Sequence, residues 1–585
     1  MEKFLEKLGK NKFEIILAVL IIAFGIFLRT YHFSDWLHFE VDQTFDFNLV
    51  SPAVAHGIAN LPLLGPNAGS QSLRLGPAFY YLEYLAAKIF GNTPQGHAGG
   101  VLSLAILALP LFYIFIRRYF SKQTSLGLLA LYATSLYLIL YSRFSWSPNV
   151  LPFLGIALAY ALLRAVSKNE KRKNVWFLIA VALATFTSQI HFNAFFTVPV
   201  IFILFLIIKR PRFSWPAWIG AVLIVLMMYL PVVLNEIKTH GQDLAFFGKE
   251  MTRVHRGQGG SLITSTINDI EYHASEFSLI LTGQDVINNA VEHGSGTDLV
   301  PLCRPGVSCK ESVAVKIFGL LVIILGTYFA IRNFRKEDED DRRNFLLLIL
   351  LWFYVFFAYM FALIHSDYSI EPRFFLFVSP LAIIFLGLAL DFLAPEKDKW
   401  RLIIFSLVII VLAALNLQKV RADFDQLKNA GHSDQDVETE DVFPDNSRLT
   451  YYQETAIANY IYSKYEKNHY PVYLQVTHKY YEALWYQLKL KGVPYFDKGQ
   501  GESPFVVYAE GNYFIIADPT KNDPFAAKRD YRFSTVGSQD FGSLIVYYLQ
   551  PKSQFVNKLI QKHQGKSLQA RQISKLMTWK KLFEN

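Results

Sequence analysis

The feature that most constrains this chain is a series of apolar runs, each long enough to cross the hydrocarbon core of a membrane. One helical crossing needs about 20 predominantly apolar residues. Such runs recur through the first 420 of the 585 residues, and short basic connectors separate them. Backbone polar groups inside a bilayer must be satisfied within the spanning element, so the runs predict α-helices. We expect about eleven spans, at 13–28, 98–116, 124–141, 148–166, 175–192, 193–208, 216–235, 313–331, 344–364, 373–393 and 402–418.

The charges between the runs predict the orientation. Four lysines precede the first run and no small-residue cleavage site follows it, which indicates an uncleaved signal anchor with a cytoplasmic N-terminus. Excess Lys and Arg mark cytoplasmic loops. With eleven spans the C-terminal domain is extracytoplasmic, and we expect a multi-pass protein of the cell membrane. Five basic connectors then share the cytoplasmic side: 117–122, 168–173, 209–212, 332–343 and 397–401.

The net charge of +9 does not indicate nucleic acid as a partner, because much of the basic excess lies in these short loops. The sequence has no zinc-finger spacing and no platform of alternating aromatic and basic residues. We therefore expect membrane lipid, and no nucleic acid, among the partners.

The chain divides by composition into a membrane domain at 1–420, a soluble extracytoplasmic α/β domain at 421–551 and a basic tail at 552–585. The fold class is thus a polytopic all-α membrane domain with a C-terminal α/β domain. In the latter we expect helices at 452–465 and 479–489, and strands at 471–476, 505–508, 513–517 and 544–549. The tail is either a solvated helix or a helix on an anionic membrane surface.

Two large outer loops interrupt the membrane domain, at 30–99 and 236–312. In the first, residues 75–90 are apolar and aromatic but short, and they carry Glu83 and Lys88, which favours a helix in the membrane interface. The second holds Cys303 and Cys309, which either form a disulfide or remain free thiols.

Four carboxylates gather within the stretch 35–46, just after the first span: Asp35, Glu40, Asp42 and Asp46. Carboxylates close to hydrocarbon are costly unless they are solvated or paired, so a cluster of them indicates either a cavity or a solvated loop. Polar and ionisable residues also collect at the outer ends of other spans, at 141–149, 187–193 and 365–373. Four such clusters facing one compartment favour a site built at that face.

These stretches resemble motifs of the GT-C-fold glycosyltransferases, polytopic enzymes that use polyprenyl-phosphate sugars. FEVDQ at 39–43 is similar to their acidic first-loop motif, and LGPAFYY with the helix to Gly91 is similar to their interfacial "PPLYY…lfG" segment. SRFSWSPN at 142–149 resembles "SRxxWNPN", and QIH at 189–191 resembles "QxH". The resemblance covers about residues 10–420 and is strongest to bacterial protein-mannosyltransferase-like and aminoarabinose-transferase-like members.

The resemblance implies transfer of a hexosyl or pentosyl unit from a polyprenyl-phosphate donor to an acceptor hydroxyl of a glycan, lipid or protein of the cell envelope. Such a reaction needs a carboxylate to take the acceptor's proton and fixed positive charge at the leaving phosphate. By motif position Asp42 is the general base. The usual acidic pair is Asp42-Gln43 here, so a divalent cation (Mg²⁺ or Mn²⁺), held by Glu40 and Asp42, stays open.

Glu40 and Asp46 are the other carboxylates expected at the substrate, and Arg143 and Arg373 are expected at the lipid phosphate because guanidinium groups match phosphate oxygens. The remaining substrate-binding candidates are Tyr80, Tyr81, Trp146, Asn149, Gln189, His191 and His365.

Each assignment has a simpler alternative. An arginine at a span end can reach the interface without binding a ligand, and aromatic residues there can anchor the helix. Two other functions compete with an enzyme: a transporter or flippase of lipid-linked sugars, and a non-catalytic assembly factor. The polar clusters lie at one face and no internal repeat is visible, which favours a one-sided enzyme.

Overall fold

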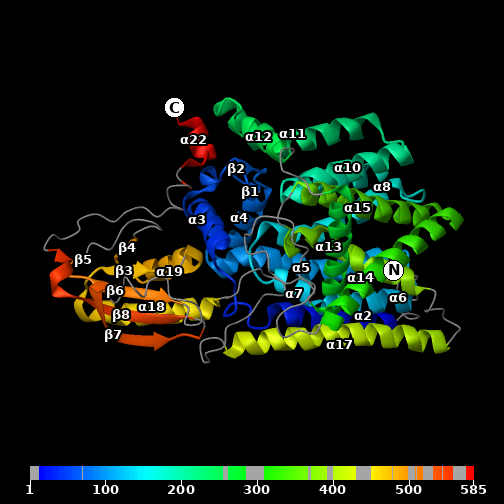
Figure 1. Ribbon diagram of the computed structural model, residues 1–585. Helices are drawn as coiled ribbons and strands as arrows, with labels where there is room; N and C mark the ends of the chain where they lie inside the picture. Colours follow the sequence, from blue (N-terminus) through cyan, green and yellow to red (C-terminus); the bar gives the residue numbers. More distant parts are fainter. Residues whose placement is uncertain are drawn as a thin grey trace.

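The computed structural model shows a helical membrane domain and a smaller α/β domain (Figure 1). It describes residues 12–68, 70–254, 261–284, 309–366, 370–391, 399–429, 449–476, 478–497, 507–508, 510–517, 531–542, 544–557, 573 and 575–584. Cys303 lies outside the described residues, and so does the side chain of Cys309, so the disulfide remains untested.

Each predicted span coincides with helical structure, and the multi-pass membrane fold is confirmed. The segments are α2 (Lys12–Thr30), α5 (Pro94–Ile116), α6 (Lys122–Thr134) with α7 (Leu136–Tyr141), η2 (Ser147–Val150) with α8 (Leu151–Val166), α9 (Lys173–Ser188), α10 (Phe192–Lys209), α11 (Trp215–Lys238), α14 (Cys309–Lys336), α15 (Asp340–His365), η3 (Pro372–Val378) with α16 (Ser379–Leu390), and α17 (Lys399–Asn429). In the described part of the chain, 9 segments are long and apolar enough to cross a membrane. The other two are the α6–α7 pair, which breaks at Ser135, and the shorter α9.

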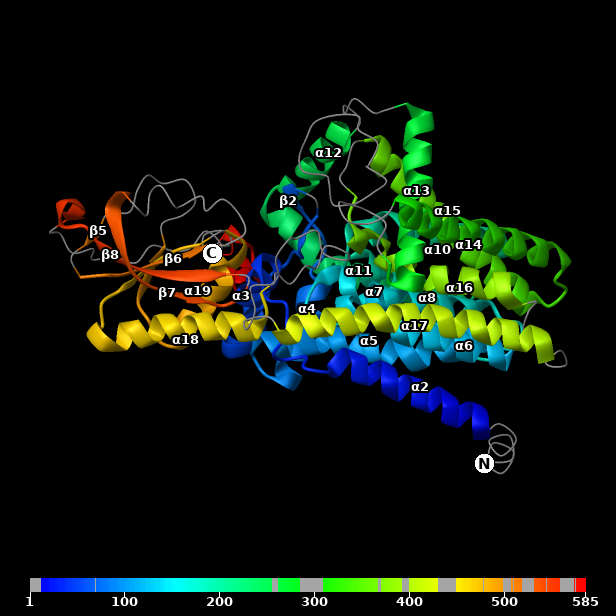
Figure 2. The same cartoon turned by 60° about the horizontal axis from the view of Figure 1, so that its bottom comes forward.

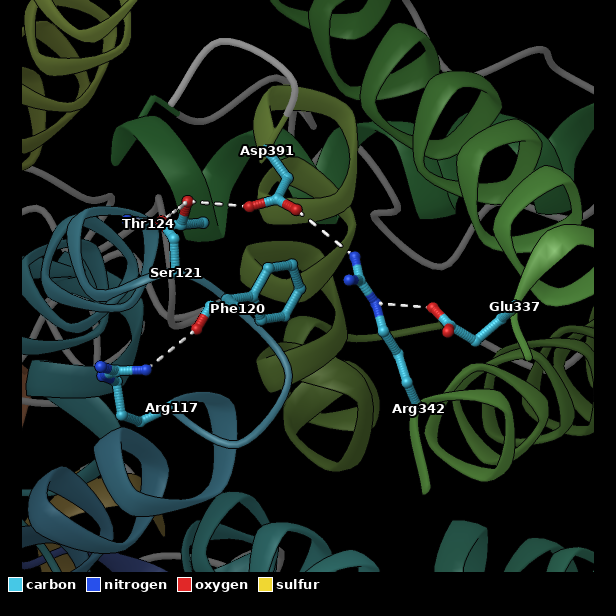
Figure 3. Close-up of polar contacts among 7 residues, drawn as sticks. All are labelled: Arg117, Phe120, Ser121, Thr124, Glu337, Arg342 and Asp391. Atoms are coloured by element: carbon cyan, nitrogen blue, oxygen red, sulfur yellow. Dashed lines mark hydrogen bonds and ion pairs between the residues drawn. The ribbon is translucent and has the colours of Figure 1, made fainter. Parts of the chain in front are cut away.

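Figure 3 shows residues of two basic connectors, 117–122 and 332–343, near Asp391 at the end of α16. Asp391, after α16, accepts hydrogen bonds from Thr124 Oγ1 (2.9 Å) and Arg342 Nη2 (3.5 Å). Ser167, after α8, donates to Asp341 Oδ2 (2.8 Å). These contacts join the connectors that follow α5, α8, α14 and α16. That this end faces the cytoplasm stays a prediction.

The range 236–312, expected as an outer loop, contains two helices, α12 (Gln242–Val254) and α13 (Leu262–Thr282). The second half of α13, from His273 to Thr282, is buried inside the membrane domain, and the helix contacts α7, α14, α15, α16 and α17. Ser135 Oγ donates to the Ile280 carbonyl oxygen (2.8 Å), and Asn416 Nδ2 donates to that of Leu281 (2.7 Å). This part of the loop prediction therefore differs from the structure.

The first outer loop folds into α3 (Val41–His56), η1 (Ile58–Asn60), β1 (Asn67–Ala68), β2 (Ser70–Arg74) and α4 (Ala78–Phe90). Helix α4 matches the interfacial helix expected at 75–90. It ends at Gly91, whose φ of 102° is a conformation that favours glycine. Helix α3 lies between the α/β domain and the bundle (Figures 1 and 2).

The C-terminal domain consists of α18 (Tyr451–Asn468), β3 (Val472–Gln475), α19 (His478–Leu490), β4 (Tyr495–Asp497), β5 (Val507–Tyr508), β6 (Asn512–Ala517), β7 (Phe533–Asp540), β8 (Ile545–Pro551), η5 (Ser553–Phe555) and β9 (Val556–Asn557). The main sheet has the order β4-β3-β6-β8-β7. Strand β3 is parallel to β4 and β6, while β8 is antiparallel to β6 and β7. The predicted α/β fold is confirmed.

The end of the tail, with helix α22 (Trp579–Phe583), packs on the first outer loop. The Leu63 amide donates to the Met577 carbonyl oxygen (3.0 Å), and the Trp579 amide donates to that of Leu61 (3.2 Å). Residues 558–572 lie outside the described residues, so the two alternatives for the tail as a whole are untested.

Candidate functional site

The acidic stretch forms the start of helix α3. Glu40 is the N-cap residue, and its amide donates to Gln43 Oε1 (3.1 Å), which is half of a capping box. Gln43 therefore has a local structural role where the family motif has a second carboxylate. Asp42 lies exposed in the first turn, where the helix dipole stabilises a negative charge. Asp46 lies one turn further and is buried.

Asp46 belongs to a buried carboxyl pair with Glu83 of α4. Burial, followed by the charges of Glu83 and Asp42, raises the pKa of Asp46 well above its ordinary value. Burial also raises the pKa of Glu83, to about 8. Neighbouring carboxyl groups that are removed from water resist double ionisation, so the pair holds a proton at neutral pH.

Arg74, at the end of β2, was not among the sequence candidates. Its charge lowers the pKa of both Asp46 and Tyr80, so it lies close to these two residues. Its Nη1 donates to the Gly65 carbonyl oxygen (3.0 Å), and its guanidinium is 5.8 Å from the centre of the Phe45 ring. Arg74 therefore supplies positive charge beside the acidic helix.

The sequence offered a weak signal for both Arg74 and Glu83. Glu83 is a carboxylate within an apolar interfacial segment, and such residues mark functional positions. Arg74 immediately precedes the LGP motif. Its approach to Asp46 depends on the turn between β2 and α4, which spacing alone does not reveal.

The outer turn at 142–149 links this acidic pair to Arg373. Ser145 Oγ donates to Glu83 Oε1. The neighbouring Trp146 places its ring 4.6 Å from the guanidinium of Arg373, which also forms an ion pair with Glu371. An arginine stacked on an indole is held in one orientation. Arg373 is thus a fixed positive charge at the start of η3.

The QIH stretch completes the arrangement. Burial, followed by the charge of Arg373, lowers the pKa of His191 to about 3, so its imidazole is neutral near pH 7. The ring of His191 is 5.7 Å from that of Phe374. Gln189 lies against Gly76, where an added Cβ would come within 2.2 Å of Gln189 Oε1. Only glycine allows this approach.

These contacts connect segments that are far apart in sequence into what we call the outer ring. It comprises Asp46, Arg74, Gly76, Tyr80, Glu83, Ser145, Trp146, Gln189, His191 and Arg373. The ring joins carboxyl groups from α3 and α4, through Ser145 and Trp146, to Arg373. Such an arrangement offers hydrogen-bonding groups and a phosphate-binding cation to one substrate.

Arg143 does not join the outer ring, although we expected it at the lipid phosphate. Its guanidinium is buried and donates to the carbonyl oxygens of Leu28 (3.1 Å), Arg29 (3.1 Å) and Tyr31 (2.7 Å). These are carbonyl groups at the C-terminal end of α2, which have no partner within the helix. The structure therefore corrects this expectation, since the donors of Arg143 cap a helix.

Three other candidates also bond within the protein. Tyr81 donates to the Pro62 carbonyl oxygen (3.3 Å) and accepts from Trp579 Nε1 (2.8 Å). Asn149 Nδ2 donates to the carbonyl oxygen of Phe144 (3.0 Å). His365 Nδ1 lies 3.1 Å from Ser265 Oγ. These bonds favour structural roles for Tyr81 and Asn149, and they place His365 beside α13.

The two residues considered for a metal point to different neighbours. Glu40 is buried, with its Oε1 3.6 Å from His38 Nδ1, and its charge acts on Glu454 of the C-terminal domain. Asp42 is exposed, and its charge acts on Asp46. Among the described residues, no group of three or more His, Cys, Asp or Glu side chains is arranged to hold a metal. A cation held by Glu40 and Asp42 is therefore untested.

Two cavities adjoin η3, the element that begins next to Arg373. One is apolar and lies between α8, α10 and α15, with Phe377 and Trp352 in its wall. The other is lined by residues that include Arg29, Tyr141, Asn149 and Leu376. Apolar space in the bundle therefore lies along the same short helix as the candidate phosphate-binding arginine.

Known structures share this architecture. ArnT from Cupriavidus metallidurans bound to undecaprenyl phosphate superposes with a TM-score of 0.52 at 12% identity, covering 94% of this chain and 100% of that one. The apo state of the same protein gives 0.52 at 11% identity over the same shares. Both have the GT-C fold. This protein has the GT-C fold.

The sequence comparison agrees with this fold over part of the chain. Residues 74–234 of this GT-C protein match the family described as dolichyl-phosphate-mannose-protein mannosyltransferase. The matched region contains Arg74, Glu83, Trp146 and His191 of the outer ring. No curated protein matches the sequence. The predicted GT-C resemblance is thereby confirmed, while the roles of individual site residues remain predictions.

Proposed function

We propose that this protein is a membrane glycosyltransferase that moves a hexosyl or pentosyl unit from a polyprenyl-phosphate donor to an acceptor hydroxyl on the extracytoplasmic side. The observation that carries the proposal is the outer ring, which links the carboxyl groups of α3 and α4 to Arg373 through Ser145 and Trp146. A one-sided site of this kind suits group transfer at the membrane surface. The acceptor is a glycan, a lipid or a protein.

The chemistry combines Arg373 of the outer ring with Asp42, which lies outside the ring and whose charge acts on Asp46. The acceptor oxygen attacks the anomeric carbon, and the bond from that carbon to the phosphate oxygen breaks, with its electron pair leaving on the phosphate. The acceptor's proton passes to the carboxylate of Asp42, which acts as general base. Arg373 stabilises the charge that develops on the leaving phosphate. Phosphate is a good leaving group, so no general acid is required.

Asp42 suits the role of base better than its neighbours. It is exposed at the start of α3, whereas the raised pKa of Asp46 keeps that buried carboxyl protonated to higher pH. A protonated carboxyl can donate a hydrogen bond but cannot accept a proton. We therefore assign Asp46 and Glu83 to hydrogen bonding with the sugar, together with Tyr80, Gln189 and His191.

The polyprenyl chain would occupy the apolar cavity beside η3. With the phosphate at Arg373, the first isoprene units would pass along η3 toward Phe377. The solved relative described as bound to undecaprenyl phosphate supports a carrier of this chemical class. The match to a dolichyl-phosphate-mannose-dependent family supports the same class of donor.

The direct experiment is to incubate the purified full-length protein with a panel of radiolabelled polyprenyl-phosphate sugars and a membrane extract as acceptor. We expect label from one donor to leave the carrier. Asp42→Asn should reduce this transfer at least about 100-fold, as expected for loss of a general base. Asp35→Asn is the matched control, because Asp35 is an exposed carboxylate just before the same helix.

Donor binding is tested separately by Arg373→Lys. The variant keeps the charge and loses the forked geometry, so we expect KM for the donor to rise about tenfold, equivalent to roughly 1.4 kcal/mol. Full transfer by Asp42→Asn, or an unchanged KM in Arg373→Lys, would contradict the respective assignment. Carrier-linked label that moves across the bilayer without leaving the carrier would instead indicate a flippase.

A further inference from the structure

The C-terminal domain is docked on the segment that leads into the acidic helix. The Tyr451 amide donates to the Leu37 carbonyl oxygen (3.1 Å), and the Tyr452 amide donates to that of Asp35 (3.0 Å). Both donors lie at the start of α18. These main-chain bonds fix the position of α18 relative to the N-terminus of α3.

Aromatic side chains also pack at this interface between the C-terminal domain and α3. The ring of Tyr486, in α19, lies 5.4 Å from that of Phe39 and 5.0 Å from that of Phe47. The ring of Tyr451 lies 6.1 Å from Phe39. Figure 1 shows α3 beside α19, between the α/β domain and the bundle. The environment at this interface is therefore largely apolar.

Two carboxyl groups are nevertheless buried there, one from each side. Glu454 of α18 is 0% exposed and Glu40 is 4% exposed. Burial, followed by the charge of Glu40, raises the pKa of Glu454 well above its ordinary value, and Gln487 of α19 opposes this shift. His38 lies 3.6 Å from Glu40 on the side of the first loop. Two carboxyl groups buried at one interface, where the charge of one acts on the other, resist double ionisation.

We propose that Glu454 is a positioning residue: a proton shared with Glu40 keeps the C-terminal domain docked and thereby holds α3, with Asp42 and Asp46, in place for transfer. Glu454 does not touch the substrate. It acts through Glu40, the N-cap residue of the helix that carries the base. The inference rests on the proposed function, because it takes Asp42 as the group to be positioned.

The dependence on pH has one direction. A carboxyl group whose pKa is raised by docking favours the docked state at low pH. This preference is lost as the pH rises from 4.5, the ordinary pKa of the group, through its raised pKa in the docked state. Loss of one proton changes the docking equilibrium by up to about tenfold per pH unit. The ionisable groups facing the pair are His38, Tyr451 and Tyr486.

Hydrogen–deuterium exchange of the full-length protein tests the inference without using activity. Peptides that contain Tyr451 and Tyr452 are followed from pH 5 to pH 9 and corrected for intrinsic exchange. In the wild type, protection should fall by up to about tenfold per pH unit. Glu454→Gln, neutral at every pH, should remove this dependence. Glu466→Gln is the matched control, since Glu466 is exposed on the same helix.

Activity measured in parallel separates positioning from mere stability. Glu454→Gln should transfer sugar within about twofold of the wild type at pH 6 and should lose less activity than the wild type at pH 9. Constant protection in the wild type across this range overturns the inference, and so does an unchanged pH dependence in Glu454→Gln. The expected exchange pattern without transfer from any donor would overturn the proposed function, and with it the claim that docking serves transfer.

Discussion

Buried ionisable side chains distinguish the outer face of this protein from an ordinary membrane surface. Asp46, Glu83 and Glu454 each carry a carboxyl group that is at most 5% exposed. Taking a carboxylate out of water costs free energy, and a protein meets that cost by pairing it or by keeping it protonated. Each of these three carboxyl groups has a raised pKa. These three carboxyl groups, from α3, α4 and α18, thus keep their protons to higher pH than exposed carboxyl groups do.

Glu83 makes the stability of the protein depend on pH. Its pKa is raised from 4.5 to about 8, so the protonated form stabilises the fold at low pH, and this contribution is lost as the pH rises through about 8. The melting temperature of the wild type should fall between pH 5 and pH 9. The melting temperature of Glu83→Gln should fall less over the same range. Parallel pH curves for the two proteins would contradict the prediction.

Arg143 should be needed for stability more than for donor binding. Arg143→Met leaves the carbonyl groups of Leu28, Arg29 and Tyr31 without their donor, and we expect a loss of about 2–4 kcal/mol. Thermal unfolding in detergent measures the change, and the exposed Arg421→Met serves as control. A stable variant with a strongly raised donor KM would restore Arg143 as a phosphate ligand.

At the scale of elements, α13 is the least expected feature. Its buried face carries Ser265, Asp269, His273 and Glu276, at spacings that fall on one side of a helix. Asp269 and His273 pair with each other, with Oδ1 and Nδ1 3.0 Å apart. His273 Nδ1 also lies 2.9 Å from the Asp269 carbonyl oxygen, and Ser265 Oγ lies 3.1 Å from His365 Nδ1. Pairing of this kind lowers the cost of burying ionisable groups in a membrane domain.

Asn416 of α17 anchors α13 to the break between α6 and α7. It accepts from the Leu136 amide (2.9 Å) and donates to the Leu281 carbonyl oxygen (2.7 Å). Asn416→Ala should lower the free energy of unfolding by about 2–4 kcal/mol, because two buried main-chain groups lose their partner. Gln418→Ala, an exposed position on the same helix, should change it little. Equal melting temperatures for both variants would refute this anchoring role.

At the scale of the whole molecule, the chain returns to its first outer loop twice. Helix α18 docks on residues 35–37, just before α3, and the tail pairs with residues 61–63, just after η1, and bonds to Tyr81 of α4. Both helices that contribute carboxyl groups to the outer ring are thus held by C-terminal segments. We expect the site to depend on parts of the chain more than 350 residues away, since Tyr451 bonds to Leu37.

Trp579 provides a test of the contact between the tail and the first outer loop. Trp579→Phe removes the donor to the Tyr81 hydroxyl but keeps an aromatic ring, so we expect a local loss of about 1 kcal/mol. The Leu63 amide, bonded to Met577, should exchange about fivefold faster. Phe583→Ala, at a side chain that is 77% exposed, is the control. Unchanged exchange at Leu63 would show that this hydrogen bond does not hold the tail.

The sequence by itself determined the span positions, the interfacial helix and the α/β domain, because apolar length and periodicity act locally along the chain. It also predicted that polar clusters from several outer ends would converge, and Trp146, His191 and Arg373 do so. Only the tertiary structure decided which arginine joins the site. Arg143 and Arg373 look alike in sequence, but one reaches carbonyl groups at a helix end and the other a half-buried indole. The burial of the second half of α13, and that of Glu40 and Glu454, likewise depends on long-range packing, which no local pattern encodes.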